Sequence, residues 1–217
     1  MQGSGKSLTA TKKIVDSKEL CYTNFHVRTP HTKRLKYAMI LEYDENNKPI
    51  RVNWDYWKDS IQKYGGFNIV IDELHNLLNA RRSMTKDNIL ITQWVAQLRK
   101  VTGENEVYDF LCISQELMRI DIAVRDLAHE IIVCEKFVGD KLIPTIVYEN
   151  GRRQKRMIPE IWIMNIYFTG QSCVDRYERW KYYGTKSYNK RNMYRANSYL
   201  RFYDSYEIVN FGETELI

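Results

Sequence analysis

The sequence predicts an α/β protein with a mostly parallel sheet, because short apolar runs alternate with segments of helical periodicity over residues 1–140. The run FNIVIDE (67–73) is almost continuously apolar and ends in two acids, which is typical of a strand buried on both faces of a parallel sheet. YDFLCISQ (108–115) and HEIIVCEKF (129–137) have the same character, so we predict that they form the second and third buried strands.

Helices are expected between these strands. The segment 8–18 has no glycine or proline, and its apolar residues recur at helical spacing. The segment 87–101 shows the same spacing, with Asp87 as a candidate cap. WDYWKDSIQKY (54–64) predicts a short helix that ends at the Gly65-Gly66 pair.

Two segments before residue 60 have the composition of strands. CYTNFHV (21–27) is rich in aromatic and β-branched residues. KYAMILEYDENNKPIRVNW (36–54) predicts a hairpin, because apolar residues alternate from Tyr37 to Tyr43 and Asn46-Asn47 supplies turn chemistry.

The composition changes beyond residue 140. KLIPTIVYE (141–149) and IPEIWIMNIYF (158–168) predict further strands, for which an antiparallel extension is one arrangement. A basic, tyrosine-rich tail follows at 175–201, which can either bind DNA phosphates or form a solvated face that docks on the core or on a neighbouring subunit. We therefore divide the chain into a core, 1–140, and a C-terminal α/β extension packed on it, 141–217.

Composition limits the classes of protein to consider. No apolar run approaches the eighteen or so residues of a membrane span, so we expect a soluble protein with no span in this chain. The net charge of +6 permits a nucleic-acid partner without requiring one. The four cysteines lie far apart without a C-x-x-C pair, which favours buried free thiols over a disulfide or a metal site.

The stretch GSGKS (3–7) matches the end of a phosphate-binding loop, G-x-x-x-x-G-K-[ST], which normally follows a buried strand. The leading glycine would fall just before Met1, so we expect the first strand and the front half of the loop to be missing from this chain. The alternative is a simple glycine turn before a helix. If the loop is real, glycines let backbone N–H groups close on the phosphates, Lys6 supplies charge to the β- and γ-phosphates, and the Ser7 hydroxyl reaches Mg²⁺. The predicted nucleotide-binding residues are Gly3, Ser4, Gly5, Lys6, Ser7 and Leu8.

A pair of acids ends the first buried strand, at the edge of a parallel sheet where ligands bind. Asp72 would hold Mg²⁺ through water, and Glu73 would polarise the attacking water in phosphoryl transfer. The alternative is a strand that ends in a solvated acidic turn. Gln115 follows the next strand and would contact the γ-phosphate or the lytic water, although such a glutamine can also be plain loop.

The order of these pieces resembles the viral genome-packaging ATPases of the FtsK and HerA superfamily, over roughly residues 1–140. Zonular-occludens-toxin-like assembly ATPases of filamentous phages are relatives in the same class. The segments that carry the resemblance, in chain order, are GKS, Thr23-Asn24, IDELHNLLNARRS, ITQWVAQLRK, FLCISQ and RIDIAVRDLAHEII.

The resemblance implies a RecA-like P-loop core that forms a homo-oligomeric ring, with ATP and Mg²⁺ between subunits and double-stranded DNA in the channel. By position, Lys6 and Ser7 match the phosphate loop, Asp72 and Glu73 the Walker B pair, and Gln115 the sensor. A trans-acting arginine is also expected, and Arg99 and Arg125 match positions where the family carries arginines, although either can instead pair with surface acids. Ala123 stands where the family's first arginine of the I-D-x-R-[IV]-R run would be.

The function that the resemblance implies is ATP-driven translocation of double-stranded DNA into a viral capsid, at its portal or vertex. The protein would then act in the host cytoplasm or on the virion. Two alternatives stay open: an assembly or secretion ATPase of the zonular-occludens-toxin-like type, and a relative that keeps the fold but does not hydrolyse ATP.

Overall fold

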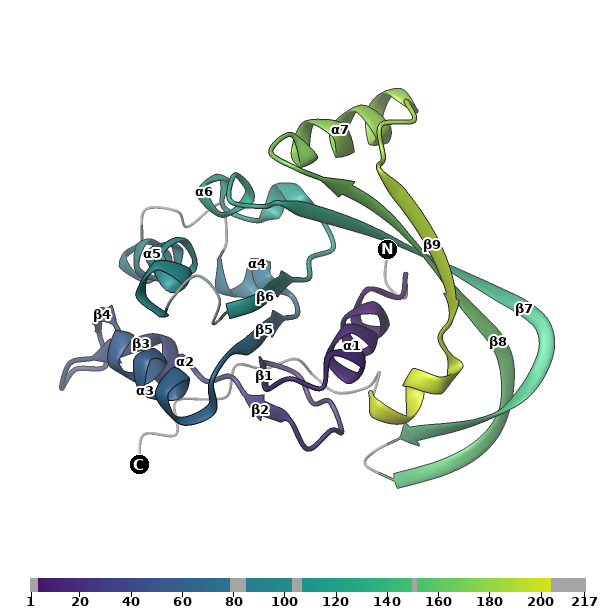
Figure 1. Ribbon diagram of the computed structural model, residues 1–217, viewed down its shortest axis with the longest axis horizontal. Coiled ribbons are helices and arrows are strands. Elements are labelled where there is room, and N and C mark those ends of the chain that lie inside the picture. The colour runs from purple at the N-terminus through teal and green to yellow at the C-terminus, as the bar shows by residue number, and fades with distance from the viewer. Residues whose placement is uncertain (1–3, 79–84, 103–106, 150–151, 204–217) are drawn as a thin grey trace. The chain divides into compact units, whose positions relative to one another are not determined.

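The computed structural model describes residues 4–78, 85–102, 107–149 and 152–203 (Figure 1). Contacts between residues group them into two compact units. The parallel-sheet unit comprises residues 14–124, and the antiparallel-sheet unit combines residues 4–13 with residues 125–203. Within these ranges, no helix is both long enough and apolar enough to cross a membrane.

The parallel-sheet unit is built on four parallel strands in the order β2-β1-β5-β6. This confirms the mixed α/β class with a parallel sheet. The central strand β5 has all five residues buried, as its apolar sequence predicts. The strand bounds are β1 Cys21–Thr23, β2 Thr32–Arg34, β5 Phe67–Ile71 and β6 Val107–Cys112.

Helices and a hairpin complete this unit. Helix α3 begins after Asn53, whose side chain accepts a hydrogen bond from the Tyr56 backbone N–H at 3.2 Å, and it ends at Gly65, where φ is +72°. Both helices predicted here, α3 and α5, are confirmed within a residue or so of the expected bounds. The elements are α2 Tyr37–Ile40, β3 Leu41–Tyr43, β4 Pro49–Val52, α3 Trp54–Tyr64, α4 Leu74–Leu77, α5 Lys86–Thr102, a 3₁₀ turn η2 Leu117–Arg119 and α6 Ile122–Arg125.

The predicted hairpin between residues 36 and 54 is correct in its second part only. Strands β3 and β4 pair antiparallel, but Tyr37–Ile40 forms the short helix α2 instead of a strand. The cause is a tertiary contact. Asn53 donates a hydrogen bond from its backbone to the Ile40 carbonyl and one from its side chain to the Ala38 carbonyl, both at 2.9 Å, which satisfies the end of this helical turn.

The core of the parallel-sheet unit centres on aromatic side chains. Trp57 of α3 lies with its ring centroid 5.3 Å from those of Tyr22 and Phe67 and 5.5 Å from that of Trp94. All four side chains are fully buried. Since each buries a large apolar area, this cluster fixes α3 and α5 against β1 and β5.

The antiparallel-sheet unit contains a long, curved hairpin, β7 Glu130–Glu149 and β8 Arg152–Thr169, with β9 Lys190–Arg195 added beside β8 (Figure 1). We predicted 129–137 as a third strand of the parallel sheet, and this is wrong. The segment begins β7, which continues through 141–149 as one strand and pairs antiparallel with β8. Its apolar run does not mean burial on both faces, because Phe137 and Val138 remain 44% and 58% exposed. The new sheet therefore starts before residue 140, where we placed the domain boundary.

Two helices pack on this antiparallel sheet. Helix α1 (Lys6–Ser17) confirms the helix predicted at 8–18. Its first half buries Leu8 against Cys134 and Ile163. The Thr9 hydroxyl donates a hydrogen bond to Asn165 Oδ1 at 3.0 Å. Helix α7 (Cys173–Tyr183) forms a second apolar cluster with β8. The predicted basic tail is thus α7, β9 and a 3₁₀ turn, η3 (Asn197–Phe202), and it packs on the strands of its own unit.

All four cysteines are free, as predicted, and burial raises the pKa of both Cys21 and Cys112 to about 12. In the unfolded chain a thiol ionises near its ordinary value, roughly pH 8.5. The folded form therefore keeps protons that the unfolded form loses, and this stabilisation, complete below about pH 8.5, is lost as the pH rises toward 12.

We predict that the urea midpoint falls steadily between pH 8 and pH 11, and that the fall is shallower in Cys21→Ala because one such group is gone. Urea unfolding at several pH values checks this. Equal pH slopes for the two proteins would contradict it.

Candidate functional site at the carboxyl edge of the parallel sheet

Asn24, directly after β1, joins the ends of β1 and β5. Its Oδ1 accepts a hydrogen bond from the Asp72 backbone N–H and its Nδ2 donates one to the Asp72 carbonyl, both at 2.8 Å. Both residues are buried. The carboxamide therefore replaces a peptide group and extends the β1–β5 ladder past the last paired residues.

The chain turns sharply after Asp72. The Asp72 carboxylate accepts a hydrogen bond from the Glu73 backbone N–H at 2.8 Å, and Glu73 adopts a left-handed conformation with φ of +53°. Leu74 then begins α4, and its N–H donates to the Ile113 carbonyl at 3.0 Å. This turn stores backbone strain, because a side chain at positive φ crowds the following carbonyl.

The Glu73 carboxylate lies between two nitrogen atoms. Gln115 donates a hydrogen bond from Nε2 to Glu73 Oε1 at 3.1 Å, and His75 Nε2 lies 3.1 Å from Glu73 Oε2. The Glu73 side chain keeps 27% of its surface exposed, whereas that of His75 keeps 12%. The carboxylate thus contacts two partners, the exposed Gln115 and the largely buried His75, and still reaches solvent, which suits a base acting on water.

The strand order explains why these residues meet. Strand β6 lies beside β5, with Ile71 opposite Cys112, and the Ile113 N–H donates to the Ile71 carbonyl at 2.8 Å. This pairing carries Gln115 to the edge where β5 ends. The structure therefore brings together Asp72, Glu73 and Gln115, three of the residues that the sequence singled out.

The carboxylate oxygens of Asp72 are suitable ligands for Mg²⁺, because Mg²⁺ prefers carboxylate and hydroxyl oxygens. Among the described residues, no three His, Cys, Asp or Glu side chains gather into a metal cluster. Mg²⁺ does not need one, since it is commonly held by one or two carboxylates, water and the phosphates of its substrate.

The predicted phosphate loop lies in the other unit. Gly5 has a φ of +92°, and a Cβ there would collide with the side chain of Ile163, so only glycine fits. Lys6 begins α1, and its Nζ donates to Ser4 Oγ at 3.1 Å. Leu8 is buried in the apolar cluster on β8. Ser7 lies in the first turn of α1, and Gly3 lies outside the described residues.

The two candidate arginines lie at or near the ends of helices α5 and α6. Arg99 lies near the end of α5, and its side chain is outside the described part of the structure. Arg125 ends α6 and is half-buried. Their role in trans therefore stays a prediction.

Sequence reasoning did not predict the role of two residues in this site. Asn24 was named only as part of the Thr23-Asn24 segment of the resemblance, because an asparagine after a strand usually belongs to a turn and its bonds to Asp72 have no local signal. His75 lies in α4 and contacts Glu73. The sequence signal for this contact is the short spacing of Glu73 and His75 in DELH.

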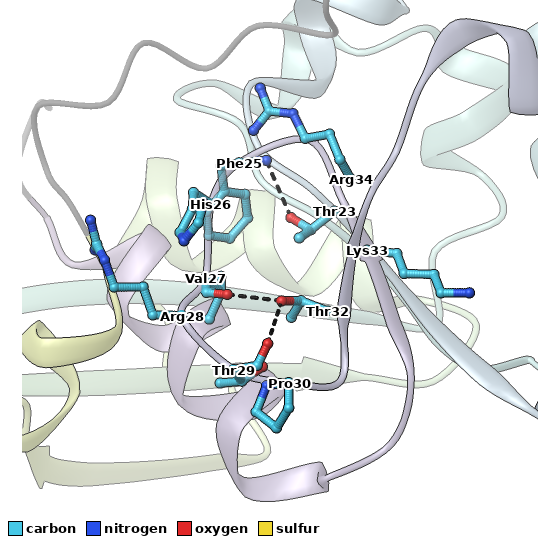
Figure 2. A pocket seen from close by; sticks show the side chains of 10 residues that line it. All are labelled: Thr23, Phe25, His26, Val27, Arg28, Thr29, Pro30, Thr32, Lys33 and Arg34. Carbon is cyan, nitrogen blue, oxygen red and sulfur yellow. Dashed lines mark hydrogen bonds between the residues drawn. The ribbon is translucent and has the colours of Figure 1, made fainter. Parts of the chain in front are cut away.

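A hollow of about 550 Å³ lies between β2 and the loop that follows β1 (Figure 2). Its cations do not converge, since Arg28 and Lys33 extend to opposite sides in Figure 2. Lys33 Nζ instead lies 3.3 Å from the centre of the Tyr64 ring, and the Thr32 hydroxyl contacts the carbonyls of Val27 and Thr29. The cations around this hollow therefore do not point toward one another, as they would in an anion-binding site.

Fold and site together define a mixed α/β protein with a cluster of polar residues at the carboxyl edge of a four-stranded parallel sheet. No model of a protein family matches this chain, and a search of curated proteins finds no similar sequence.

The strain at Glu73 gives a prediction about stability. Glycine tolerates positive φ, so Glu73→Gly should be more stable than Glu73→Ala by about 1 kcal/mol, although both lose the carboxylate. Urea unfolding of the two variants measures this difference. As a control, the same pair at Glu42 in β3, where φ is not positive, should favour alanine. A more stable alanine variant at residue 73 would contradict the assigned conformation.

Proposed function

We propose that this chain is an ATP-hydrolysing motor that moves double-stranded DNA, in the manner of the viral genome-packaging ATPases that its sequence resembles. The observation that carries the proposal is the Glu73 carboxylate, which follows the central strand of a parallel sheet and is hydrogen-bonded to Gln115 from the neighbouring strand. Ligands of open α/β sheets bind at this edge.

The chemistry assigned to the acids follows from their surroundings. Glu73 is partly exposed and oriented, so it suits the role of polarising the water that attacks the γ-phosphate. Asp72 is buried with its backbone fixed by Asn24, so it suits the role of placing Mg²⁺ through water. Mg²⁺, when bound, would neutralise charge on the transferring phosphoryl group.

Gln115 would report the state of the nucleotide. Its amide now bonds to Glu73, and the same amide can turn to a γ-phosphate oxygen or to the attacking water. Because Gln115 follows β6, such an exchange would couple hydrolysis to the segment after that strand. Breaking a hydrogen bond of this kind involves about 1 kcal/mol, which a bound phosphate can readily offset.

Support for the phosphate loop comes from GSGKS and from the start of α1. Positive φ at Gly5 and the helix that begins at Lys6 provide a glycine turn leading into a helix N-terminus, where backbone N–H groups favour phosphate. Lys6 and Ser7 would then serve the phosphates and Mg²⁺ as the motif predicts.

The partner in this proposal is double-stranded DNA, contacted through its backbone, and the assembly is a homo-oligomeric ring at a capsid portal or vertex. The ring and the capsid come from the resemblance alone. DNA also has support in the charge distribution. Residues 1–13 and 125–206 contain 18 of the 33 lysines and arginines but 9 of the 27 acids, which gives a net charge of +9 against −3 for the rest of the chain.

The proposal predicts Mg²⁺-dependent phosphate release from ATP that increases when duplex DNA is added. Glu73→Gln and Lys6→Ala should lower the rate by about a hundredfold or more, because each removes a group that acts on the reacting phosphate or water. Glu116→Gln is the matched control, since Glu116 is exposed and pairs with Arg119. Its rate should stay within about twofold of the parent.

The outcomes separate the alternatives. Hydrolysis that needs Glu73 but ignores DNA would favour the assembly-ATPase alternative. No hydrolysis by the parent chain would favour the relative that keeps only the fold. An unchanged rate in Glu73→Gln would contradict the site itself.

A further inference from the structure

We propose that the β7–β8 hairpin is a nucleic-acid-binding arm, and that the residues which contact the phosphates of a duplex are Arg152, Arg153, Lys155 and Arg156. This inference deepens the proposed function by naming the surface that holds the DNA. Its test does not require ATP hydrolysis, so the two proposals can fail separately.

The four cations occupy five consecutive positions at the start of β8, in the sequence RRQKR, and all four side chains are exposed. Opposite them on β7 stand mostly uncharged residues. Tyr148 pairs with Arg153 and Ile146 with Lys155, and Glu149, opposite Arg152, is the one acid that pairs with the segment. Four cations thus stand opposite one acid at this end of the hairpin, and this excess of positive charge favours a polyanionic partner.

Strand geometry distributes these cations over both faces of the ribbon. Successive residues of a strand point to opposite faces, so Arg153 and Lys155 share one face while Arg152 and Arg156 share the other. Along the strand, Arg153 and Lys155 are about 7 Å apart and Arg152 and Arg156 about 14 Å apart, roughly two and four times the axial rise of 3.4 Å per nucleotide of one DNA strand. A two-stranded ribbon also fits the major groove, where cations on its two faces can reach the backbones on either side.

Hydrogen bonds from Asn197, a residue of the same unit, hold the two strands of the hairpin. The Asn197 side chain accepts a hydrogen bond from the Ile161 N–H at 2.7 Å, and its Nδ2 donates to the Pro159 carbonyl at 3.1 Å and to Thr145 Oγ1 at 3.3 Å. Asn197 and Thr145 are buried. These bonds tie β7, β8 and the turn after β9 together, so the arm presents its cations from an ordered support at a low entropic cost of binding.

A nucleic acid explains this surface better than a lipid membrane does. A membrane-binding surface needs apolar side chains beside its cations. The exposed Leu142 and Val138 of β7 pair with Pro159 and Ile161, three and five positions beyond Arg156. Among the described side chains of 145–148 and 152–157, Met157 is the one large apolar side chain that is mostly exposed, whereas Ile146 and Tyr148, opposite the cations, are half-buried. This end of the hairpin therefore offers more exposed charge than exposed apolar area.

The test measures binding of a fluorescent 30-base-pair DNA duplex by anisotropy, without nucleotide, over a series of salt concentrations. The arm variant carries Arg152→Gln, Arg153→Gln, Lys155→Gln and Arg156→Gln. The control variant removes the same charge from exposed lysines of the parallel-sheet unit, through Lys36→Gln, Lys48→Gln, Lys58→Gln and Lys100→Gln. Circular dichroism melts establish that both variants are folded.

We expect the arm variant to bind at least about tenfold more weakly than the parent at moderate salt, and the control to change by less than about threefold. The slope of log affinity against log salt should decrease by about 0.9 for each phosphate contact that is lost. DNA-independent ATP hydrolysis should be unchanged in the arm variant, because none of the four residues belongs to the site at β5.

Equal weakening in the arm and control variants would overturn the proposal, since it would mean attraction by net charge alone. Unchanged duplex binding by the arm variant would overturn it as well. Vesicles of phosphatidylserine and phosphatidylcholine serve as the competing probe. Cation-dependent binding to them, without duplex binding, would assign the arm to a membrane surface instead.

Discussion

The two hydrogen bonds between the Asn24 side chain and the Asp72 backbone are the constraint on which the candidate site depends. They are buried, and loss of the carboxamide would leave a peptide N–H and a carbonyl without partners, at a cost of about 1–3 kcal/mol each. They fix the chain at the end of β5, and the next residue, Glu73, adopts a left-handed conformation. The Glu73 carboxylate contacts Gln115 and His75. A contact between two strands thus helps to position the carboxylate that we propose as the catalytic base.

The molecule assigns different physical tasks to its two units. The parallel-sheet unit carries the acids and the amide that suit phosphoryl transfer, and the positive and negative charges of residues 14–124 balance. The antiparallel-sheet unit holds most of the positive charge and the long hairpin, which suit contact with a polyanion. The proposed motor would need both, because the chemical step requires fixed dipoles while translocation requires many weak, salt-sensitive contacts.

Sequence reasoning succeeded where the signal was local. The apolar run of β5, the periodicity of α5 and the end of α3 at Gly65 each reflect burial or backbone preference within a few residues.

Sequence reasoning failed where contacts with distant residues decide the secondary structure or the strand pairing. Tyr37–Ile40 alternates like a strand, yet Asn53 closes it into a helical turn. The apolar segment 129–137 resembles a strand of the parallel sheet, but its partner is β8, and no property of the segment alone distinguishes these pairings. The RRQKR segment matches no motif and is shorter than the basic tail, so the sequence alone does not distinguish it as a binding surface.

Hydrogen–deuterium exchange with and without Mg²⁺ and ATP would test the central claim most directly, namely that nucleotide binds at the carboxyl edge of β5. The account predicts slower amide exchange in peptides covering residues 71–75 and 110–116, and no change in the hairpin β3–β4, which lies outside the site. The slowing should require Mg²⁺ and should be lost in Lys6→Ala. Protection elsewhere, with residues 71–75 unaffected, would contradict the account.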